Sequence, residues 1–128
     1  MLITNKNVGV GLAGHKGRGV YALAYLKRGT TIEVCPVIFL GVTDTENLSQ
    51  TILNDYVYEA DDGRTALALG YGSLYNHSDT PNAHFDLNPS GILVITAIRD
   101  IESKQEICID YGGKEAEFLP SKGKGKKR

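Results

Sequence analysis

The feature that most constrains the fold is a polar stretch at residues 70–82, GYGSLYNHSDTPN. It lies between two strand-like runs, residues 65–69 and 83–87. Glycine and proline interrupt it too often for a core element, and it is richer in aromatic residues than an ordinary surface loop. We interpret it as the floor of a ligand site, and we expect residues 106–112, EICIDYG, to be its partner.

The length and residue pattern bound the class of protein. A chain of 128 residues predicts one domain that can bury its own core. Short runs of β-branched residues, with turns about every eight to twelve residues, predict a mainly β fold with almost no helix. No apolar run approaches the roughly 20 residues of a membrane span, and the first residues lack the pattern of a signal peptide.

The two cysteines, Cys35 and Cys108, both lie in apolar runs. Their context favours buried thiols in an intracellular, reducing compartment. A disulfide is open in principle, but nothing in the context indicates one. The chain has no C-x-x-C motif, so the sequence predicts no metal site.

Several elements are predicted from local pattern. Residues 31–40 read as a strand, in which Pro36 implies an edge position or a bulge. Residues 43–46 resemble a capping box that opens a short helix. Residues 55–60, DYVYEA, are predicted as a strand on which Tyr56 and Tyr58 share one face. A channel rich in tyrosine would suit a long aliphatic amine, through apolar walls and cation–π attraction.

The charge is distributed unevenly along the chain. Residues 122–128, KGKGKKR, hold five of the 14 Lys and Arg residues, which leaves nine against all 15 Asp and Glu. Residues 1–121 therefore carry a net charge of −6. An acidic body attracts basic partners, although such a charge can also serve only to keep the domain soluble.

Three short motifs have ordinary explanations when each is taken alone. The Gly17-Arg18-Gly19 turn needs no ligand. The Asn76-His77-Ser78 segment could be an Asx-type turn, and no spacing supports a metal site built from His77, His84 and Asp110. Tyr111, at a predicted strand end, could pack in the core or line a pocket.

Together, these motifs occur in an informative order. GRGVYA at residues 17–22, YNHSDTPN at 75–82 and DIESKQEICIDYG at 100–112 closely resemble the SET-domain protein-lysine methyltransferases. Their pattern is a G-x-G loop, an N-H-S-x-x-P-N segment and a closing E-[IL]-x-x-D-Y-G. The chain looks like the minimal stand-alone forms of viruses and microbes, with a SET domain at residues 1–113 and a tail at 114–128, basic and disordered from 121.

The resemblance implies a fold and a cofactor. The fold would be the SET-domain, or β-clip, arrangement of small curved sheets with a C-terminal pseudoknot. The methyl donor would be S-adenosylmethionine, the product S-adenosylhomocysteine, and no metal would take part. The implied cofactor-binding residues, with His77 acting mainly through its backbone, are Lys16, Gly17, Arg18, Gly19, Asn76, His77 and Tyr111.

The resemblance also implies a channel for the substrate lysine. Its catalytic residues would be Tyr111, which orients the amine, and Tyr56. The residues expected to line the channel are Tyr56, Tyr58, Tyr71, Tyr75 and Phe118. Phe118 and Leu119 could close the channel, form a dimer contact or only pack on the body, so a monomer and a homodimer both stay open.

The chain departs from the family pattern at two places near the central motif. Asp79 stands where many relatives have a zinc-binding cysteine, and no cysteine follows Cys108, so the zinc module after the SET domain is absent. Leu74 and Tyr75 replace the arginine and phenylalanine that often precede N-H-S. Tyr75 therefore bears on how many methyl groups the site accepts.

The sequence thus predicts a protein-lysine N-methyltransferase, located in the cytoplasm or at nuclear chromatin. Its substrate would be a basic protein, such as a histone or another DNA-associated protein. The alternative is a catalytically silent SET-like domain that binds a basic peptide or the cofactor. The tail resembles a histone-tail segment, which predicts automethylation at Lys122, Lys124 or Lys126, binding in a neighbour's groove, or a solvated tail with weak nucleic-acid contact.

Overall fold

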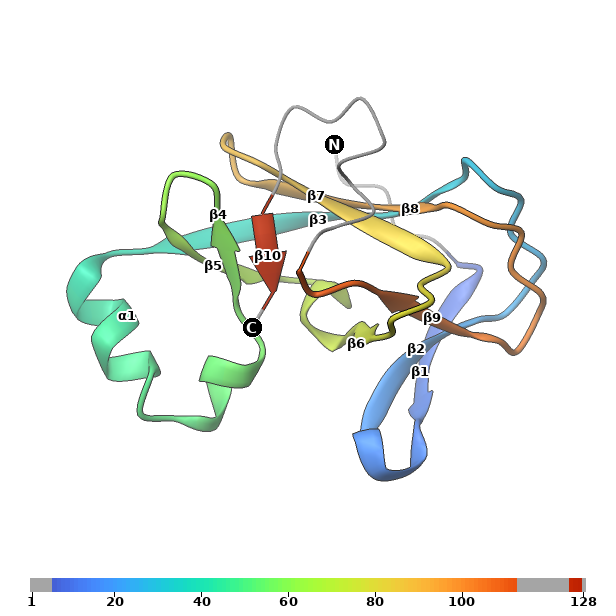
Figure 1. Cartoon of the computed structure of the whole chain (residues 1–128), viewed down its shortest axis with the longest axis horizontal. Coiled ribbons are helices and arrows are strands. Elements are labelled where there is room, and N and C mark those ends of the chain that lie inside the picture. The colour runs from blue at the N-terminus through green and yellow to red at the C-terminus, as the bar shows by residue number, and fades with distance from the viewer. Residues whose placement is uncertain (1–5, 113–124, 128) are drawn as a thin grey trace.

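The structure, a computed structural model, describes residues 6–112 and 125–127 (Figure 1). The strands of this part are β1 (Val8–Leu12), β2 (Arg18–Ala22), β3 (Thr31–Leu40), β4 (Tyr58–Ala60), β5 (Thr65–Ala68), β6 (Asn76–His77), β7 (Ala83–Asn88), β8 (Ile92–Ala97), β9 (Glu106–Ile109) and β10 (Gly125–Lys127). Its helices are α1 (Val42–Leu48) and the short 3-10 helices η1 (Gly14–Lys16), η2 (Ile52–Asp55) and η3 (Gly72–Leu74). The mainly β fold that the sequence predicts is confirmed.

The strands form two small sheets. One has the strand order β1-β2-β9-β6, and the other has the order β10-β4-β5-β3-β8-β7. In Figure 1 the β1–β2 hairpin extends from one end of the molecule, and β10 lies beside β4 at the edge of the larger sheet. Among the described strands, β6 and β9 are the one parallel pair.

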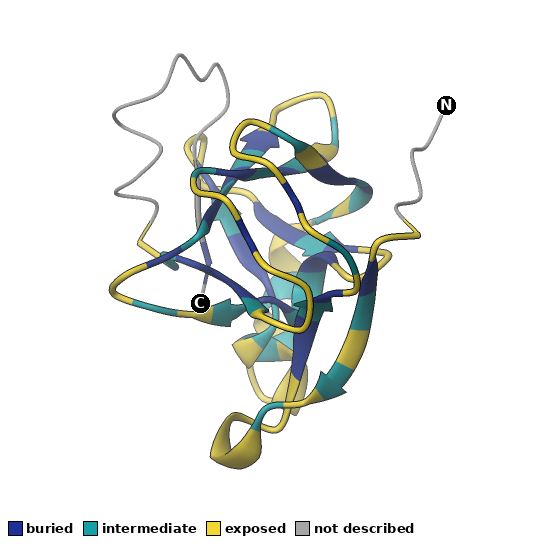
Figure 2. Cartoon of the chain, turned by 90° about the vertical axis from the view of Figure 1, so that its right-hand side faces the viewer, coloured by how far each residue is buried: buried dark blue, intermediate teal, exposed yellow. Residues whose placement is uncertain are grey.

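The core follows from alternation along the strands. On β7, Ala83, Phe85 and Leu87 are buried, and the residues between them are half-buried. On β8, Leu93 and Ile95 are buried in the same way. Successive side chains of a strand point to opposite faces, so this pattern places one face of the hairpin inside. Figure 2 shows buried strand segments, in dark blue, in the middle of the molecule and exposed loops, in yellow, around them.

Pro36 does not lie at a sheet edge, because β3 has β5 on one side and β8 on the other. Residues 31–36 pair with β8, and residues 37–40 pair with β5. The proline, which has no N–H to donate, lies where β3 changes partners. The register shift of this strand falls between Thr31 and Glu33 and not at Pro36.

Two other local predictions are corrected. The short helix exists, but α1 begins after Gly41 and has no side-chain cap, so the predicted capping box does not form. Tyr56 follows η2 and lies outside β4, because a helical turn takes up the first half of the predicted strand. At the other end of the chain, residues 125–127 pair with β4, where the sequence predicts disorder.

Other sequence expectations concern cysteines, metals and membranes. Cys35 and Cys108 are free and buried, and burial raises the pKa of the Cys108 thiol to about 11. Within residues 6–112 and 125–127, no cluster of three or more His, Cys, Asp or Glu side chains could hold a metal ion. None of the helices described is long and apolar enough to cross a membrane.

Candidate active site

The two stretches that the sequence singles out do meet. Strand β6 pairs in parallel with β9, so that Asn76 lies opposite Cys108 and His77 opposite Ile109. Asn82 joins them further: its amide nitrogen donates to the Glu106 carbonyl at 2.9 Å, and its amide oxygen accepts from the Cys108 backbone N–H at 2.9 Å. The expected contact between residues 70–82 and 106–112 is therefore confirmed.

A pocket of about 400 Å³ opens beside this junction. Its lining residues come from the β1–β2 hairpin with its η1 turn, from the η2 and η3 helices, from strands β6 and β10, and from the segment after β9. They are Leu12, Lys16, Gly17, Arg18, Asp55, Tyr56, Ser73, Leu74, Asn76, Tyr111 and Lys127. Five of the seven expected cofactor-binding residues are among them, and Gly19 and His77 are not. Sequence reasoning missed Asp55, Ser73 and Lys127, which no motif marks.

Glu106 fixes the polar wall of this pocket. Its Oε2 accepts a hydrogen bond from the Asn76 amide at 2.7 Å, and its Oε1 lies 3.6 Å from the Lys16 ammonium. The same Asn76 nitrogen also donates to the Arg18 carbonyl at 2.9 Å. The side-chain N–H groups of Asn76 thus donate to acceptors within the protein, and its side-chain oxygen is the atom that a ligand would contact.

Gly19 is required behind this wall. A Cβ atom there would lie 2.5 Å from Glu106 Oε2 and 3.0 Å from Asn76 Nδ2. The Glu106 carboxylate, which Asn76 and Lys16 hold in place, would have to move. The glycine therefore allows the close approach of β2 to the Asn76–Glu106 hydrogen bond.

We expect Gly19→Ala to weaken S-adenosylmethionine binding about tenfold, the effect of losing one hydrogen bond to a charged group. Calorimetry of cofactor binding measures this loss. Gly41→Ala is the matched control, because a Cβ atom at Gly41 would meet only Asp44, at 3.9 Å. Equal affinities for the two variants would show that Gly19 does not support the pocket.

The His77 side chain faces Tyr111. Its Nδ1 accepts the Tyr111 backbone N–H at 3.0 Å, and its Nε2 lies 2.9 Å from Asp79 Oδ1. The imidazole therefore fixes the backbone that carries Tyr111. Asp79, at the position where relatives often have a zinc ligand, orients this ring instead.

Tyr111 lines the pocket from the segment that follows β9. Its hydroxyl donates to the Tyr75 carbonyl at 2.8 Å. Burial, with the nearby Cys108 and Glu106 acting in the same direction, raises the pKa of the Tyr111 hydroxyl to about 12. The phenol is therefore protonated at neutral pH and acts as a hydrogen-bonding group, not as a base.

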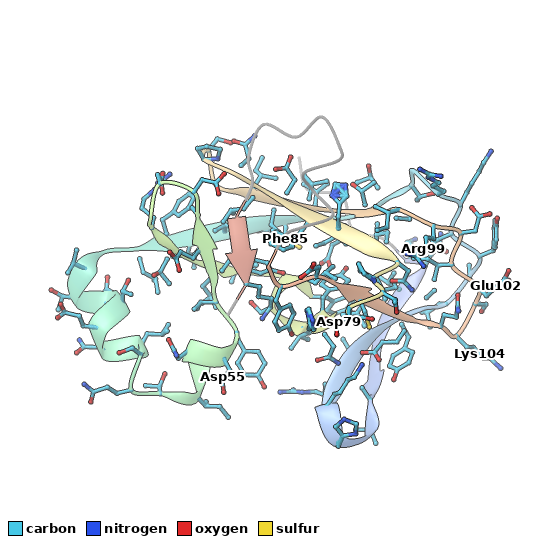
Figure 3. The ribbon with its side chains drawn as sticks, viewed as in Figure 1. Asp55, Asp79, Phe85, Arg99, Glu102 and Lys104 are labelled. Atoms are coloured by element: carbon cyan, nitrogen blue, oxygen red, sulfur yellow. The ribbon has the colours of Figure 1, made fainter. Side chains whose placement is uncertain are left out.

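A lysine side chain enters beside this tyrosine. Lys127 of β10 is only 5% exposed, and its Nζ lies 4.7 Å from the ring centre of Tyr111, 5.4 Å from that of Tyr58 and 5.8 Å from that of Tyr56. The ammonium also donates to the Asp55 carbonyl at 3.4 Å. Figure 3 shows Asp55 near the C-terminal end of β10. These three tyrosines form a cage around a lysine, which is the shape expected of a lysine channel.

The structure places the other expected channel residues elsewhere. Tyr75 is buried, and its hydroxyl donates to Glu33 Oε1 at 2.7 Å. The backbone N–H of Tyr71 donates to the other oxygen of this carboxylate at 2.9 Å. Both residues thus support η3 through the buried Glu33, and neither lines the pocket. Phe118 lies outside the described residues.

The automethylation predicted for Lys122, Lys124 or Lys126 stays a prediction. Lys122 and Lys124 lie outside the described residues. The backbone of Lys126 pairs with Glu59 in the β10–β4 ladder. The lysine in the channel is its neighbour Lys127, which the Gly-Lys alternation of the tail did not single out.

Comparison with known proteins identifies the family. Residues 17–112 match the SET domain. The chain is 38% identical over 99 residues to the histone-lysine N-methyltransferase, H3 lysine-37 specific, of Schizosaccharomyces pombe, which covers 76% of this chain and 67% of that relative.

Solved structures agree with this result. A candidate histone methyltransferase of Plasmodium falciparum superposes with a TM-score of 0.71 at 33% identity, covering 86% of this chain and 96% of that one. The methyltransferase domain of human histone-lysine N-methyltransferase SETMAR superposes with a TM-score of 0.74 at 20% identity, covering 94% of this chain and 49% of that one, and it supports the fold alone.

The chain belongs to the SET-domain family. It is therefore an enzyme of the class that the ordered motifs indicate, the S-adenosylmethionine-dependent protein-lysine methyltransferases.

Proposed function

We propose that this enzyme methylates the side-chain amine of a lysine in a basic protein tail, such as that of a histone. The observation that carries the proposal is the cage of Tyr56, Tyr58 and Tyr111, which holds a lysine amine at the edge of the polar pocket. A lysine side chain that enters between these rings is removed from the solvent. Its amine then reaches the pocket that Gly17 and Asn76 line.

The pocket has the size and donors that S-adenosylmethionine needs. Its volume of about 400 Å³ lies in the range of small-molecule sites. The Lys16 and Arg18 cations suit the carboxylate of an amino acid, and the side-chain carbonyl oxygen of Asn76 suits its ammonium. When bound, this cofactor supplies a methyl group on a positively charged sulfur.

The channel prepares the amine for attack. Burial lowers the pKa of the Lys127 amine to about 8, against the weaker opposing effect of Asp55. A lysine in this place loses its proton to solvent far more easily than a free lysine, whose pKa is about 10.4. The residues therefore contribute orientation and dehydration, and no side chain is needed as a dedicated base.

A basic peptide fits the surface around this channel. Residues 1–121 carry a net charge of −6, which favours the approach of a cationic tail. The side of β4 away from β5 can pair with an extended strand: β10 pairs there, in the register that puts a lysine opposite Tyr58. An extended basic segment with a lysine at this register would bind in the same way.

Methyl transfer to a basic peptide tests the proposal. The protein is incubated with S-adenosylmethionine and a histone-tail peptide, and the peptide is then mapped by mass spectrometry. We expect mass increases of whole methylene groups on one lysine. Cofactor binding by calorimetry without any transfer would favour the silent binding domain instead.

A further inference from the structure

The C-terminal strand lies where a bound peptide would lie. β10 pairs antiparallel with β4, with Gly125 opposite Ala60 and Lys127 opposite Tyr58. On its other side, the Lys127 backbone N–H donates to the Tyr111 carbonyl at 2.7 Å. Main-chain bonds on both sides are how a groove holds an extended peptide.

The Lys127 side chain completes this likeness. Lysine is almost never fully buried unless it is paired, yet Lys127 is 5% exposed and its ammonium donates a long hydrogen bond of 3.4 Å to the Asp55 backbone carbonyl. The groups that face the amine are the Asp55 backbone and the rings of Tyr56, Tyr58 and Tyr111, and the Asp55 carboxylate acts on it electrostatically without forming an ion pair with it. A lysine whose role was to anchor the tail would be better placed against a carboxylate.

The amine also faces the right cavity. Lys127 lines the same pocket as Lys16, Gly17 and Asn76, the residues that would hold the cofactor. The lysine whose amine lies among the three tyrosine rings is therefore also part of the wall of the pocket that would hold the cofactor. A reactive amine needs this placement next to the donor.

We propose that Lys127 is the enzyme's own substrate, methylated by the active site of the same chain. The inference rests on the proposed function of that site. In the step, the neutral amine of Lys127 donates its lone pair to form a new N–C bond with the methyl group of S-adenosylmethionine. The S–C bond breaks, its electron pair stays on sulfur as a thioether, and the methylated ammonium releases a proton to solvent.

The proposal has a consequence for other substrates. While Lys127 occupies the channel, a peptide in trans cannot enter, so its apparent affinity falls by the fraction of chains that are open. The tail is then both a substrate and a competitor. Lys127→Ala is expected to raise kcat/KM for a histone-tail peptide several-fold.

Three proteins test the modification site: the natural chain, Lys127→Ala and Lys126→Ala. The Lys126→Ala variant is the matched control, because it removes one positive charge from the same strand. Each is incubated with S-adenosylmethionine and digested for mass mapping. We expect methylation at residue 127 in the natural chain and in Lys126→Ala, at a rate per molecule that does not depend on protein concentration. Methylation at another lysine, or a rate proportional to concentration, would overturn the proposal.

A second measurement needs no cofactor. Lysine side-chain NMR of the three proteins, titrated with pH, should show one signal with a midpoint near 8. It should be present in Lys126→Ala and absent from Lys127→Ala. If every lysine signal titrates near the ordinary value of about 10.4, Lys127 does not occupy the channel and the proposal fails.

The same samples separate this inference from the proposed function. If a histone-tail peptide added in trans is methylated and Lys127 is not, the inference is overturned and the proposed function stands. If neither the peptide nor Lys127 is methylated while the cofactor binds, the proposed function itself fails. Lys127→Arg, which keeps a cation but cannot become a methyl-lysine, covers the case in which the alanine variant does not fold.

Discussion

Tyr111→Phe is expected to lower the rate of methyl transfer about 100-fold, the cost of misplacing a reacting group, while cofactor affinity stays unchanged. The substitution keeps the ring that lies 4.7 Å from the lysine nitrogen. It removes the hydroxyl that donates to the Tyr75 carbonyl at 2.8 Å, and with it the oxygen that we propose to orient the amine and the methyl group through weak C–H···O contacts. Single-turnover transfer and calorimetry with the cofactor measure the two effects.

The control for this experiment is Tyr25→Phe. Tyr25 also has a hydroxyl in a hydrogen bond, to Asp100, but it is 52% exposed and does not line the pocket. Its variant should transfer methyl groups at the natural rate. If Tyr111→Phe is as active as Tyr25→Phe, the Tyr111 hydroxyl does not position the reacting atoms.

The rate of the chemical step is expected to rise about tenfold per pH unit below a midpoint of 8 or lower, and to level off above it. Only the neutral amine is a nucleophile, so the rate follows the deprotonated fraction of the lysine in the channel. Burial lowers the pKa of the Lys127 amine to about 8, so we expect the same direction for a peptide lysine in its place, and the positive sulfur of the cofactor would lower that pKa further. The Tyr111 hydroxyl, with a pKa near 12, adds no second inflection.

Single-turnover rates between about pH 6 and about pH 10 check this profile, with peptide and cofactor saturating. Cofactor binding measured across the same range is the control, because a change in affinity would distort the curve. A midpoint near 10.4, the value of a free lysine, would mean that the channel does not dehydrate the amine. A flat profile would mean that a step other than methyl transfer limits the rate.

The strands with strong local patterns were predictable from sequence. β3 has the predicted bounds, and the β7–β8 hairpin has the predicted turn, because β-branched residues and turn residues act over short distances. Tyr56 was placed wrongly on a strand for the same reason. Its neighbours alternate like a strand, but η2 takes them into a helical turn before β4 begins.

The sequence motifs of the site were predictable, but the residues that hold those motifs in place by hydrogen bonds were not. Asn76 and Tyr111 stand in recognisable segments, so a comparison of patterns finds them. Glu106 and Glu33 hold the site through hydrogen bonds to residues 30 and 42 positions away, and no local rule connects such partners. The buried carboxylate of Glu33 also explains why Tyr75 is a core residue, although it stands beside the motif.

The role of Lys127 could not be predicted from composition. A run of lysine and glycine is typical of a solvated, disordered tail. Pairing with β4 supplies backbone partners that the tail cannot provide alone, and the tyrosine cage supplies the apolar wall for one lysine. Tertiary context thus overrides the local preference for disorder.

The parallel pairing of β6 with β9 has a consequence for how the protein is made. Such a pair cannot form by a local hairpin, because residues 76–77 must wait for residues 108–109. During synthesis at about 5 to 20 residues per second, the β3–β5 and β1–β2 contacts can form while the Asn76 wall still lacks Glu106. The nascent chain therefore gains its cofactor pocket late, and we expect the growing polypeptide to be unable to bind S-adenosylmethionine until β9 has left the ribosome.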